Sequence, residues 1–391
     1  MAKIKDVRTT IWQWIGPVAP MPPHFCTTPT DMITDQTGTI AGFRFLGWLV
    51  VELELDNGTV GIGNAALAPQ ATKVVIDTYL KPLLIGQDPM NSEYLWQSMY
   101  RRTLPYGRKG IGMTAISAVD LAIWDAKGKL LKEPVFRLLG GRTKPDIPVY
   151  ASRLYSQPLD QLARETEAYI KQGFKAVKLR FGWGPKDGVA GIQENLKLVR
   201  CVREVAGDGI DIMADCFMGW TLEYARRMMR VLAPFNMRWI EEPLVPDDIA
   251  GYAELRAMGH VPISGGEHEY TLAGFRQLID AKAVDVAQPD VNRVGGITVA
   301  KKIADLCEAH DIVFIPHAGQ MHNYHVTMSS YAAPISEYFP KVPVEVGNEL
   351  FWYVFDGEPT AKDGAVDLRD DLPGFGLILQ KPKAEEFKLI S

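Results

Sequence analysis

The fold is decided by three short apolar runs: IDIMAD (residues 210–215), MRWIEE (237–242) and PISGGE (262–267). Each run precedes a stretch with the periodicity of an amphipathic helix, and such alternation is typical of parallel βαβ units. Comparable runs begin at five further positions: Ile147, Lys175, Val284, Ile312 and Ile335. Eight parallel strands are enough for a sheet to close on itself. The sequence therefore predicts an α/β fold with a (β/α)8-type, modified TIM barrel over residues 145–345.

The first part of the chain, residues 1–140, has strand patterns first and helical patterns afterwards, which is the α+β order. The run 48–63 alternates in polarity around an Asn-Gly pair, a strong signal for a hairpin turn. Helical periodicity follows from Ala71 onward. The turn-rich segment 346–391 is too short for a domain of its own. We therefore expect an N-terminal α+β capping domain on which the C-terminal segment packs back to complete it.

The composition excludes several classes of protein. The 391 residues are 47% hydrophobic and 23% charged, as in ordinary folded proteins. A net charge of −5 without blocks of like charge predicts no nucleic acid and no membrane as partner, and a small molecule as ligand. The four cysteines form no Cys-x-x-Cys pair, which argues against a zinc knuckle and for reduced thiols. Since no apolar run matches a signal peptide or membrane span, we expect a cytoplasmic protein.

The predicted barrel strands end in polar residues, which is where a parallel barrel carries its catalytic groups. Asp215, Glu241 and Glu267 end three consecutive strands, 26 residues apart in each case. Neighbouring carboxylates repel one another unless a cation lies between them, and oxygen ligands suit Mg²⁺ better than zinc. We predict that these three residues bind one Mg²⁺ per subunit. The alternative is a salt-bridge network in which Arg180 and other cations neutralise the carboxylates.

A candidate base follows further along the chain. His317 ends the seventh run, and Asp290 lies in the loop that leaves the sixth. A carboxylate beside an imidazole fixes its tautomer and raises its basicity, so the two residues are predicted to form a catalytic dyad. Such a base works together with a metal ion, because proton removal beside a carboxylate creates an enediolate that needs stabilisation. Two nearby histidines, His322 and His325, are expected on a helix surface or in a loop.

Together these motifs resemble the mandelate racemase subgroup of the enolase superfamily. The stretch SAVDLAIWDAKGKLLKEPVFRLLGG (117–141) resembles the junction from cap to barrel in that family, and the acidic trio and the dyad follow in the family's order. Three segments resemble the L-rhamnonate dehydratase branch: DCFM (215–218), GEHE (266–269) and DLPGFGL (371–377). The resemblance implies a Mg²⁺-dependent acid-sugar dehydratase. It also implies a homo-oligomer, as dimers or octamers.

The second predicted barrel strand departs from the racemases of this subgroup. Those end the strand with Lys-x-Lys, whose second lysine is a base, whereas this chain has Lys178-Leu179-Arg180. Arginine stays protonated, so only His317 can accept a proton, and two-sided racemisation is not expected. Arg180 suits binding of a substrate oxygen and Lys178 suits stabilising the enediolate. Glu337 resembles the eighth-strand acid that bonds the substrate carboxylate in this family.

With one base, the expected reaction is a dehydration. His317 removes the carbon-2 proton of an aldonate and then, as imidazolium, protonates the leaving 3-hydroxyl to give a 2-keto-3-deoxy acid. The resemblance implies a (2R)-configured acid such as L-rhamnonate, L-mannonate or L-lyxonate; a galactonate dehydratase and a non-catalytic binding homologue are the alternatives. A lid loop is expected at about residues 18–35. His24 in this loop and Arg44 beyond it are candidate substrate contacts.

Overall fold

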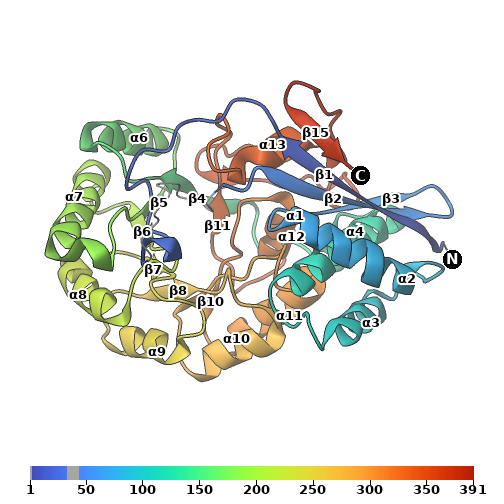
Figure 1. Cartoon of the computed structure of the whole chain (residues 1–391), viewed down its shortest axis with the longest axis horizontal. Coiled ribbons are helices and arrows are strands. Elements are labelled where there is room, and N and C mark those ends of the chain that lie inside the picture. The colour runs from blue at the N-terminus through green and yellow to red at the C-terminus, as the bar shows by residue number, and fades with distance from the viewer. Residues whose placement is uncertain (1, 33–43) are drawn as a thin grey trace.

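The computed structural model describes residues 2–32 and 44–391 and contains a capping domain beside a barrel-type domain (Figure 1). The cap has an antiparallel sheet of strand order β15-β1-β2-β3. β2 (Gly47–Leu55) and β3 (Val60–Ala65) form the predicted hairpin. Its turn contains Gly58 at a φ of 84°, which glycine adopts without steric cost.

Helices cover one face of the cap sheet. α4 (Ile111–Leu131) lies directly against β3. The two backbones are so close that a Cβ at Gly63 would lie only 1.9 Å from the carbonyl oxygen of Ala118, which leaves no room for a side chain. The other helical elements of this part are η1 (Pro29–Met32), α1 (Pro69–Val75), the π-helical turn η2 (Ile76–Leu80), α2 (Lys81–Leu84), α3 (Ser92–Thr103) and α5 (Val135–Leu138). The glycines of β3 thus let a helix and a strand pack at backbone distance.

The second domain is a curled sheet of eight parallel strands in the order β10-β9-β8-β7-β6-β5-β4-β11. Their bounds are β4 (Ile147–Leu154), β5 (Ala176–Arg180), β6 (Asp211–Asp215), β7 (Trp239–Glu241), β8 (Ile263–Gly265), β9 (Val286–Ala287), β10 (Val313–Phe314) and β11 (Ser336–Tyr338). A separate cluster of buried side chains, which includes Tyr150, Met213 and Trp239, packs among these strands. The parallel barrel-type fold predicted from the strand pattern is confirmed.

A helix follows each of the first seven barrel strands, and Figure 1 shows α6 to α11 as an arc outside the sheet. The bounds are α6 (Leu159–Lys171), α7 (Gly188–Ala206), α8 (Leu222–Leu232), α9 (Ile249–Ala257), α10 (Thr271–Asp280), α11 (Gly296–Ala309) and α12 (Met321–Met328). After β11 the chain makes only two short turns, η5 (Asn348–Leu350) and α13 (Phe351–Val354). The eighth unit therefore lacks the amphipathic helix that the repeat pattern predicts, because the chain turns back toward the cap.

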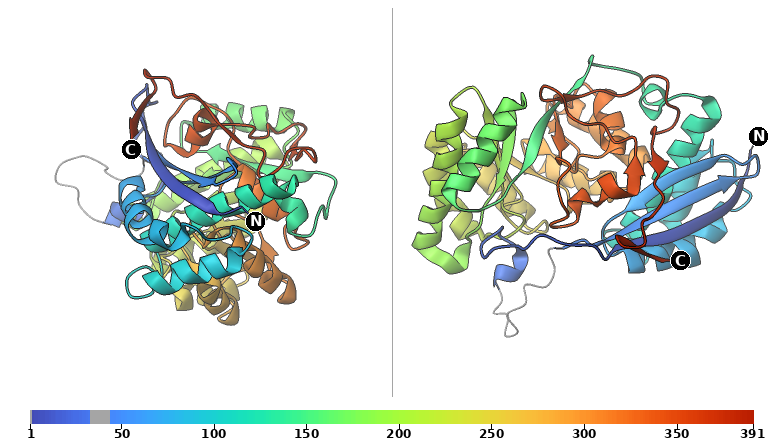
Figure 2. Two further views of the ribbon diagram at one scale, coloured as in Figure 1. Left: turned by 90° about the vertical axis from the view of Figure 1, so that its right-hand side faces the viewer. Right: turned by 90° about the horizontal axis from the view of Figure 1, so that it is seen from above.

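The C-terminal segment returns to the start of the chain. β15 (Phe387–Ile390) pairs antiparallel with β1 (Ile4–Trp14), and Figure 2 shows both chain ends on the side of the cap. Before that, β13 (Ala365–Val366) pairs with β4, and β12 (Phe355–Asp356) pairs with β14 (Ile378–Leu379). The segment thus completes the cap sheet and also contacts the barrel. The boundaries 1–140, 145–345 and 346–391 stay a prediction.

The prediction for the histidines of α12 is wrong. His322 and His325 are 1% and 2% exposed, and the backbone N–H of Phe136 donates to Nδ1 of His325 at 2.9 Å. Both are buried because α12 is packed against α5 and α11. In the part of the chain that the structure describes, no helix has both the length and the apolar character needed to cross a membrane.

Candidate active site

The parallel register brings the three predicted metal ligands together. Asp215 at the end of β6 pairs with Glu241 at the end of β7, and Glu267 follows two residues after β8. One oxygen of each carboxylate lies within 4.8 Å of one oxygen of each of the others, and all three residues are buried. Three carboxylate oxygens at this spacing suit a single hard cation.

Two cations from β5 contact these carboxylates. Lys178 is fully buried, with Nζ 2.5 Å from Oε1 of Glu241 and 2.8 Å from Oε1 of Glu337. Arg180 donates through Nη1 to Oδ2 of Asp215. Burial by itself lowers the pKa of Lys178, but Glu241 and Glu337 raise it well above its usual range. Lys178 therefore remains a cation between two carboxylates.

The candidate base and its carboxylate meet just beyond the ends of β9 and β10. Nδ1 of His317 is 2.9 Å from Oδ2 of Asp290, and its Nε2 is 3.3 Å from Oε2 of Glu267. Burial lowers the pKa of His317, whereas Glu267 and the hydrogen bond to Asp290 raise it, to about 9. The imidazole thus has one nitrogen held by Asp290 and the other directed at the acidic cluster.

Arg293 joins the base to the predicted metal ligands, and the sequence analysis missed it. Its Nε lies 2.9 Å from Oδ2 of Asp290, and its Nη1 lies 3.2 Å from Oε1 of Glu267. The residue is 9% exposed and lies between β9 and α11. Its position three residues after Asp290 could have indicated its role. The sequence analysis considered only residues at the ends of predicted strands and therefore did not include it.

The charge balance of this cluster fits a divalent cation. Three permanent cations, Lys178, Arg180 and Arg293, face five buried carboxylates: Asp215, Glu241, Glu267, Asp290 and Glu337. With a neutral imidazole, as a base requires, two negative charges are in excess. Burial raises the pKa of Glu241 to about 7; Lys178 opposes this rise, and Asp215 and Glu337 add to it. A salt-bridge network alone would leave this excess buried, whereas a dication neutralises it.

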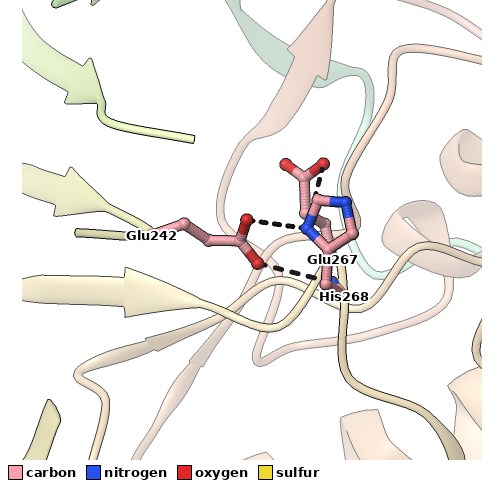
Figure 3. Close-up of side chains that lie close together, drawn as sticks. All are labelled: Glu242, Glu267 and His268. Atoms are coloured by element: carbon pink, nitrogen blue, oxygen red, sulfur yellow. Dashed lines mark hydrogen bonds and ion pairs between the residues drawn. The ribbon is translucent and has the colours of Figure 1, made fainter. Parts of the chain in front are cut away.

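A histidine–glutamate pair, His268 and Glu242, lies beside the cluster (Figure 3). Nδ1 of His268 is 2.8 Å from Oε2 of Glu242 and 3.7 Å from Oε1 of Glu267. Burial lowers the pKa of His268, but both glutamates raise it above its ordinary value. Glu242, the second glutamate of the WIEE sequence, is therefore paired with His268 and not with the three permanent cations of the cluster.

Neutral donors fix the orientation of two of the acids. Oε2 of Glu241 accepts hydrogen bonds from Nε2 of Gln288 at 2.9 Å and from Nε1 of Trp239 at 3.1 Å. Oε2 of Glu337 accepts from the backbone N–H of Ala318 at 2.8 Å. The sequence analysis did not single out Gln288 or Trp239, although each lies two residues before a predicted site acid.

The two candidate substrate contacts in the cap lie apart from this cluster. Nδ1 of His24 is 3.1 Å from the carbonyl oxygen of Gly182, and its ring stacks on Trp183 with centroids 4.9 Å apart. Arg44 donates through Nη2 to the carbonyl oxygen of Ala19 at 2.8 Å. Within residues 2–32 and 44–391, no hydrogen bond or ion pair links either side chain to the acidic cluster. Residues 33–35 of the predicted lid loop lie outside the described residues, and the roles of both side chains stay predictions.

A capped parallel barrel with a buried acidic cluster that suits a cation and a His-Asp pair is typical of the metal-assisted enolase-type enzymes. The model for enolase C-terminal domain-like proteins matches residues 161–383. The model for the N-terminal domain of mandelate racemase / muconate lactonizing enzyme matches residues 39–140. The chain belongs to the mandelate racemase / muconate lactonizing enzyme family of the enolase superfamily.

Several relatives are similar over nearly the full chain. The L-rhamnonate dehydratase of Saccharopolyspora erythraea is 37% identical over 348 residues, which are 88% of this chain and 86% of the relative. The crystal structure of rhamnonate dehydratase from Gibberella zeae complexed with Mg is 32% identical, with a TM-score of 0.84 over 97% of this chain and 94% of that one. The 3,6-anhydro-D-galactonate cycloisomerase from Zobellia galactanivorans is 31% identical, with a TM-score of 0.80 over 96% and 97%. The predicted family is confirmed, and its members at this identity carry different activity names.

Proposed function

We propose that this chain is a Mg²⁺-dependent acid-sugar dehydratase that acts on L-rhamnonate or a related aldonate. One observation carries the proposal: Asp290 holds Nδ1 of His317, and Nε2 of the same imidazole lies 3.3 Å from Glu267 in the buried acidic cluster. The imidazole of His268 also approaches Glu267, at 3.7 Å, but its Nδ1 is bonded to Glu242. The position opposite, at the end of β5, holds an arginine, which cannot accept a proton. The similarity to L-rhamnonate dehydratases supports the same reaction.

Each site residue has a separate role in the proposed reaction. Asp215, Glu241 and Glu267 would hold the Mg²⁺, which when bound makes the hydrogen beside a coordinated carboxylate acidic. His317 accepts the carbon-2 proton at Nε2, because Asp290 engages Nδ1 and Nε2 is the nitrogen directed at the acidic cluster. The same nitrogen then gives a proton to the 3-hydroxyl, which leaves as water. The product is a 2-keto-3-deoxy acid.

The cations of β5 act by charge. Lys178 lies between Glu241 and Glu337 and therefore offers positive charge to the developing oxyanion without accepting a proton. Arg180, bonded to Asp215, is available to bind a carboxylate or hydroxyl oxygen of the substrate. Glu337 would bond the substrate carboxylate. A single proton acceptor on one side of the substrate favours dehydration over racemisation.

The cellular setting is part of the same proposal. The four cysteines are free thiols in the structure, which suits the reducing cytoplasm. The family resemblance supports a homo-oligomer, a dimer or an octamer, which light scattering on the purified protein measures. An acid-sugar substrate, rather than nucleic acid or membrane, is the expected partner.

The proposal is tested by assaying keto-acid formation with semicarbazide on L-rhamnonate, L-mannonate, L-lyxonate and galactonate. We expect turnover of at least one acid, its loss in EDTA and its recovery with added Mg²⁺. No keto acid from any of the four would favour a non-catalytic binding homologue, and full activity in EDTA would exclude the role of the metal.

The base is tested by a matched pair of variants. His317→Asn should lose at least about 10²–10⁴-fold in kcat, since general-base catalysis contributes that much, while Mg²⁺ binding by calorimetry persists. His260→Asn changes an exposed histidine and should leave both unchanged. Wild-type turnover by His317→Asn would show that another group removes the proton.

A further inference from the structure

Trp48 carries an unusual buried donor. The residue is the second of cap strand β2 and is 2% exposed, and its indole N–H has no hydrogen-bond partner among the described residues. A buried N–H without a partner destabilises a fold, so most such groups in native proteins are bonded to the protein, to water or to a ligand. A native chain that departs from this rule often does so at a functional site.

The other buried indoles show what a purely structural tryptophan does here. Nε1 of Trp96 donates to the carbonyl oxygen of Gly295 at 2.9 Å, and Nε1 of Trp352 donates to that of Phe339 at 3.0 Å. Among the described tryptophans, Trp48 is the one whose buried N–H is left open. Packing alone therefore does not explain why the indole N–H of Trp48 has no hydrogen-bond partner.

Trp48 is part of the lining of the cavity that contains the base. Trp48 lines this cavity together with Asp290, Asn292 and His317. The cap and barrel are joined beside it, because Nδ2 of Asn292 donates to the carbonyl oxygen of Asn64 at 2.8 Å. Asn64 lies on β3 opposite Val50 of β2, so the start of β2 is held next to the loop that carries Asp290.

A second open group in this cavity complements the first. Oδ1 of Asn292 is buried and has no partner among the described residues. The bond from its Nδ2 to the backbone carbonyl of Asn64 fixes which atom is the oxygen, since a carbonyl only accepts. Trp48 can only donate and Oδ1 of Asn292 can only accept. A hydroxyl both donates and accepts, so it is the kind of ligand group that matches these two open atoms.

We propose that Trp48 is a specificity residue whose indole N–H donates to a hydroxyl oxygen on the carbon chain of the acid sugar, while Oδ1 of Asn292 accepts the proton of that hydroxyl. The proposal rests on the acid-sugar dehydratase function. The carboxylate end of the substrate lies with the acidic cluster and its cations, so the hydroxyl that Trp48 recognises is one beyond carbon 3.

The test uses Trp48→Phe, which keeps the ring and removes the N–H, and the matched control Trp96→Phe. For the best substrate of the panel, Trp48→Phe should lower kcat/KM about 3- to 10-fold, the usual worth of one neutral hydrogen bond. The loss should vanish on the analogue that lacks the contacted hydroxyl, tested with the 4-deoxy and 5-deoxy acids. Without substrate, Trp48→Phe should melt at the wild-type temperature or above. Trp96→Phe leaves a buried carbonyl unpaired and should melt about 1–3 °C lower.

Unchanged kcat/KM on the full panel would overturn the proposal and leave the dehydratase function standing. A loss that persists on both deoxy acids would also overturn it, because no hydroxyl would then depend on the N–H. If the wild type turns over no panel acid, the proposed dehydratase function is rejected. The Trp48 contact is then tested by the shift in melting temperature that L-rhamnonate with Mg²⁺ produces. A smaller shift for Trp48→Phe than for the wild type supports the contact; equal or absent shifts reject it.

Discussion

Replacing Arg293 by methionine removes one of the three permanent cations of the site and keeps most of the apolar length of the side chain. The wild-type guanidinium joins Asp290 at 2.9 Å and Glu267 at 3.2 Å, and it is 9% exposed. Removing one partner of a buried ion pair costs about 3–5 kcal/mol, because the remaining charge stays buried without compensation. We therefore expect Arg293→Met to lose about 3–5 kcal/mol of unfolding free energy in EDTA.

Mg²⁺ should restore part of this loss. Without Arg293 the excess of negative charge in the cluster is larger by one, so a dication is attracted more strongly than in the wild type. Because binding to the folded state stabilises it by mass action, saturating Mg²⁺ should raise the stability of Arg293→Met by more than it raises that of the wild type. Arg293→Lys keeps the charge but cannot reach both carboxylates with a planar fork, and should fall between the two.

The assay is urea unfolding followed by tryptophan fluorescence, in EDTA and in excess Mg²⁺. Arg276→Met is the control, since that arginine is exposed and its contact with Asp280 is 4.0 Å long. A loss below about 1 kcal/mol for Arg293→Met in EDTA, or equal Mg²⁺ stabilisation of variant and wild type, would refute the charge balance described here.

Three further predictions concern the acids, the base and the buried histidines. Gln288→Leu frees Glu241 from a fixed donor and should weaken Mg²⁺ binding about 10- to 100-fold by calorimetry; an unchanged affinity would contradict this. In D₂O, NMR should show carbon-2 exchange of one substrate epimer only, because Lys178 is no proton acceptor; exchange of both would reject that view. Burial lowers the pKa of His322 to about 4 and of His325 to about 3, so the unfolded chain binds more protons below pH 6.5. Each should therefore reduce stability by about 1.4 kcal/mol per pH unit as the pH falls from about 6.5 to 4, and His325→Asn should show a shallower acid slope in urea titrations.

The sequence alone determined the elements and the acids they carry. The alternation of apolar runs with helical periodicity predicted the barrel-type domain, and the Asn-Gly pair predicted the hairpin, because both signals are local in the chain. The positions of Asp215, Glu241 and Glu267 at the ends of consecutive strands predicted that they meet, since parallel strands align their ends at one edge. The regular register of the sheet converts spacing in sequence into proximity in space.

Only the tertiary structure decided which other groups reach this edge. Gln288 acts on the acids from the loop directly after β9, and Arg293 acts from a turn before α11; the local pattern of neither segment carries such a signal. His325 was expected at the surface and is buried, because helix packing decides which face of α12 meets solvent. Trp48 and Asn292 are 244 residues apart and line one cavity only because the cap docks on the barrel. Periodicity reports contacts within an element, whereas these contacts arise from the way separate elements fill the same volume.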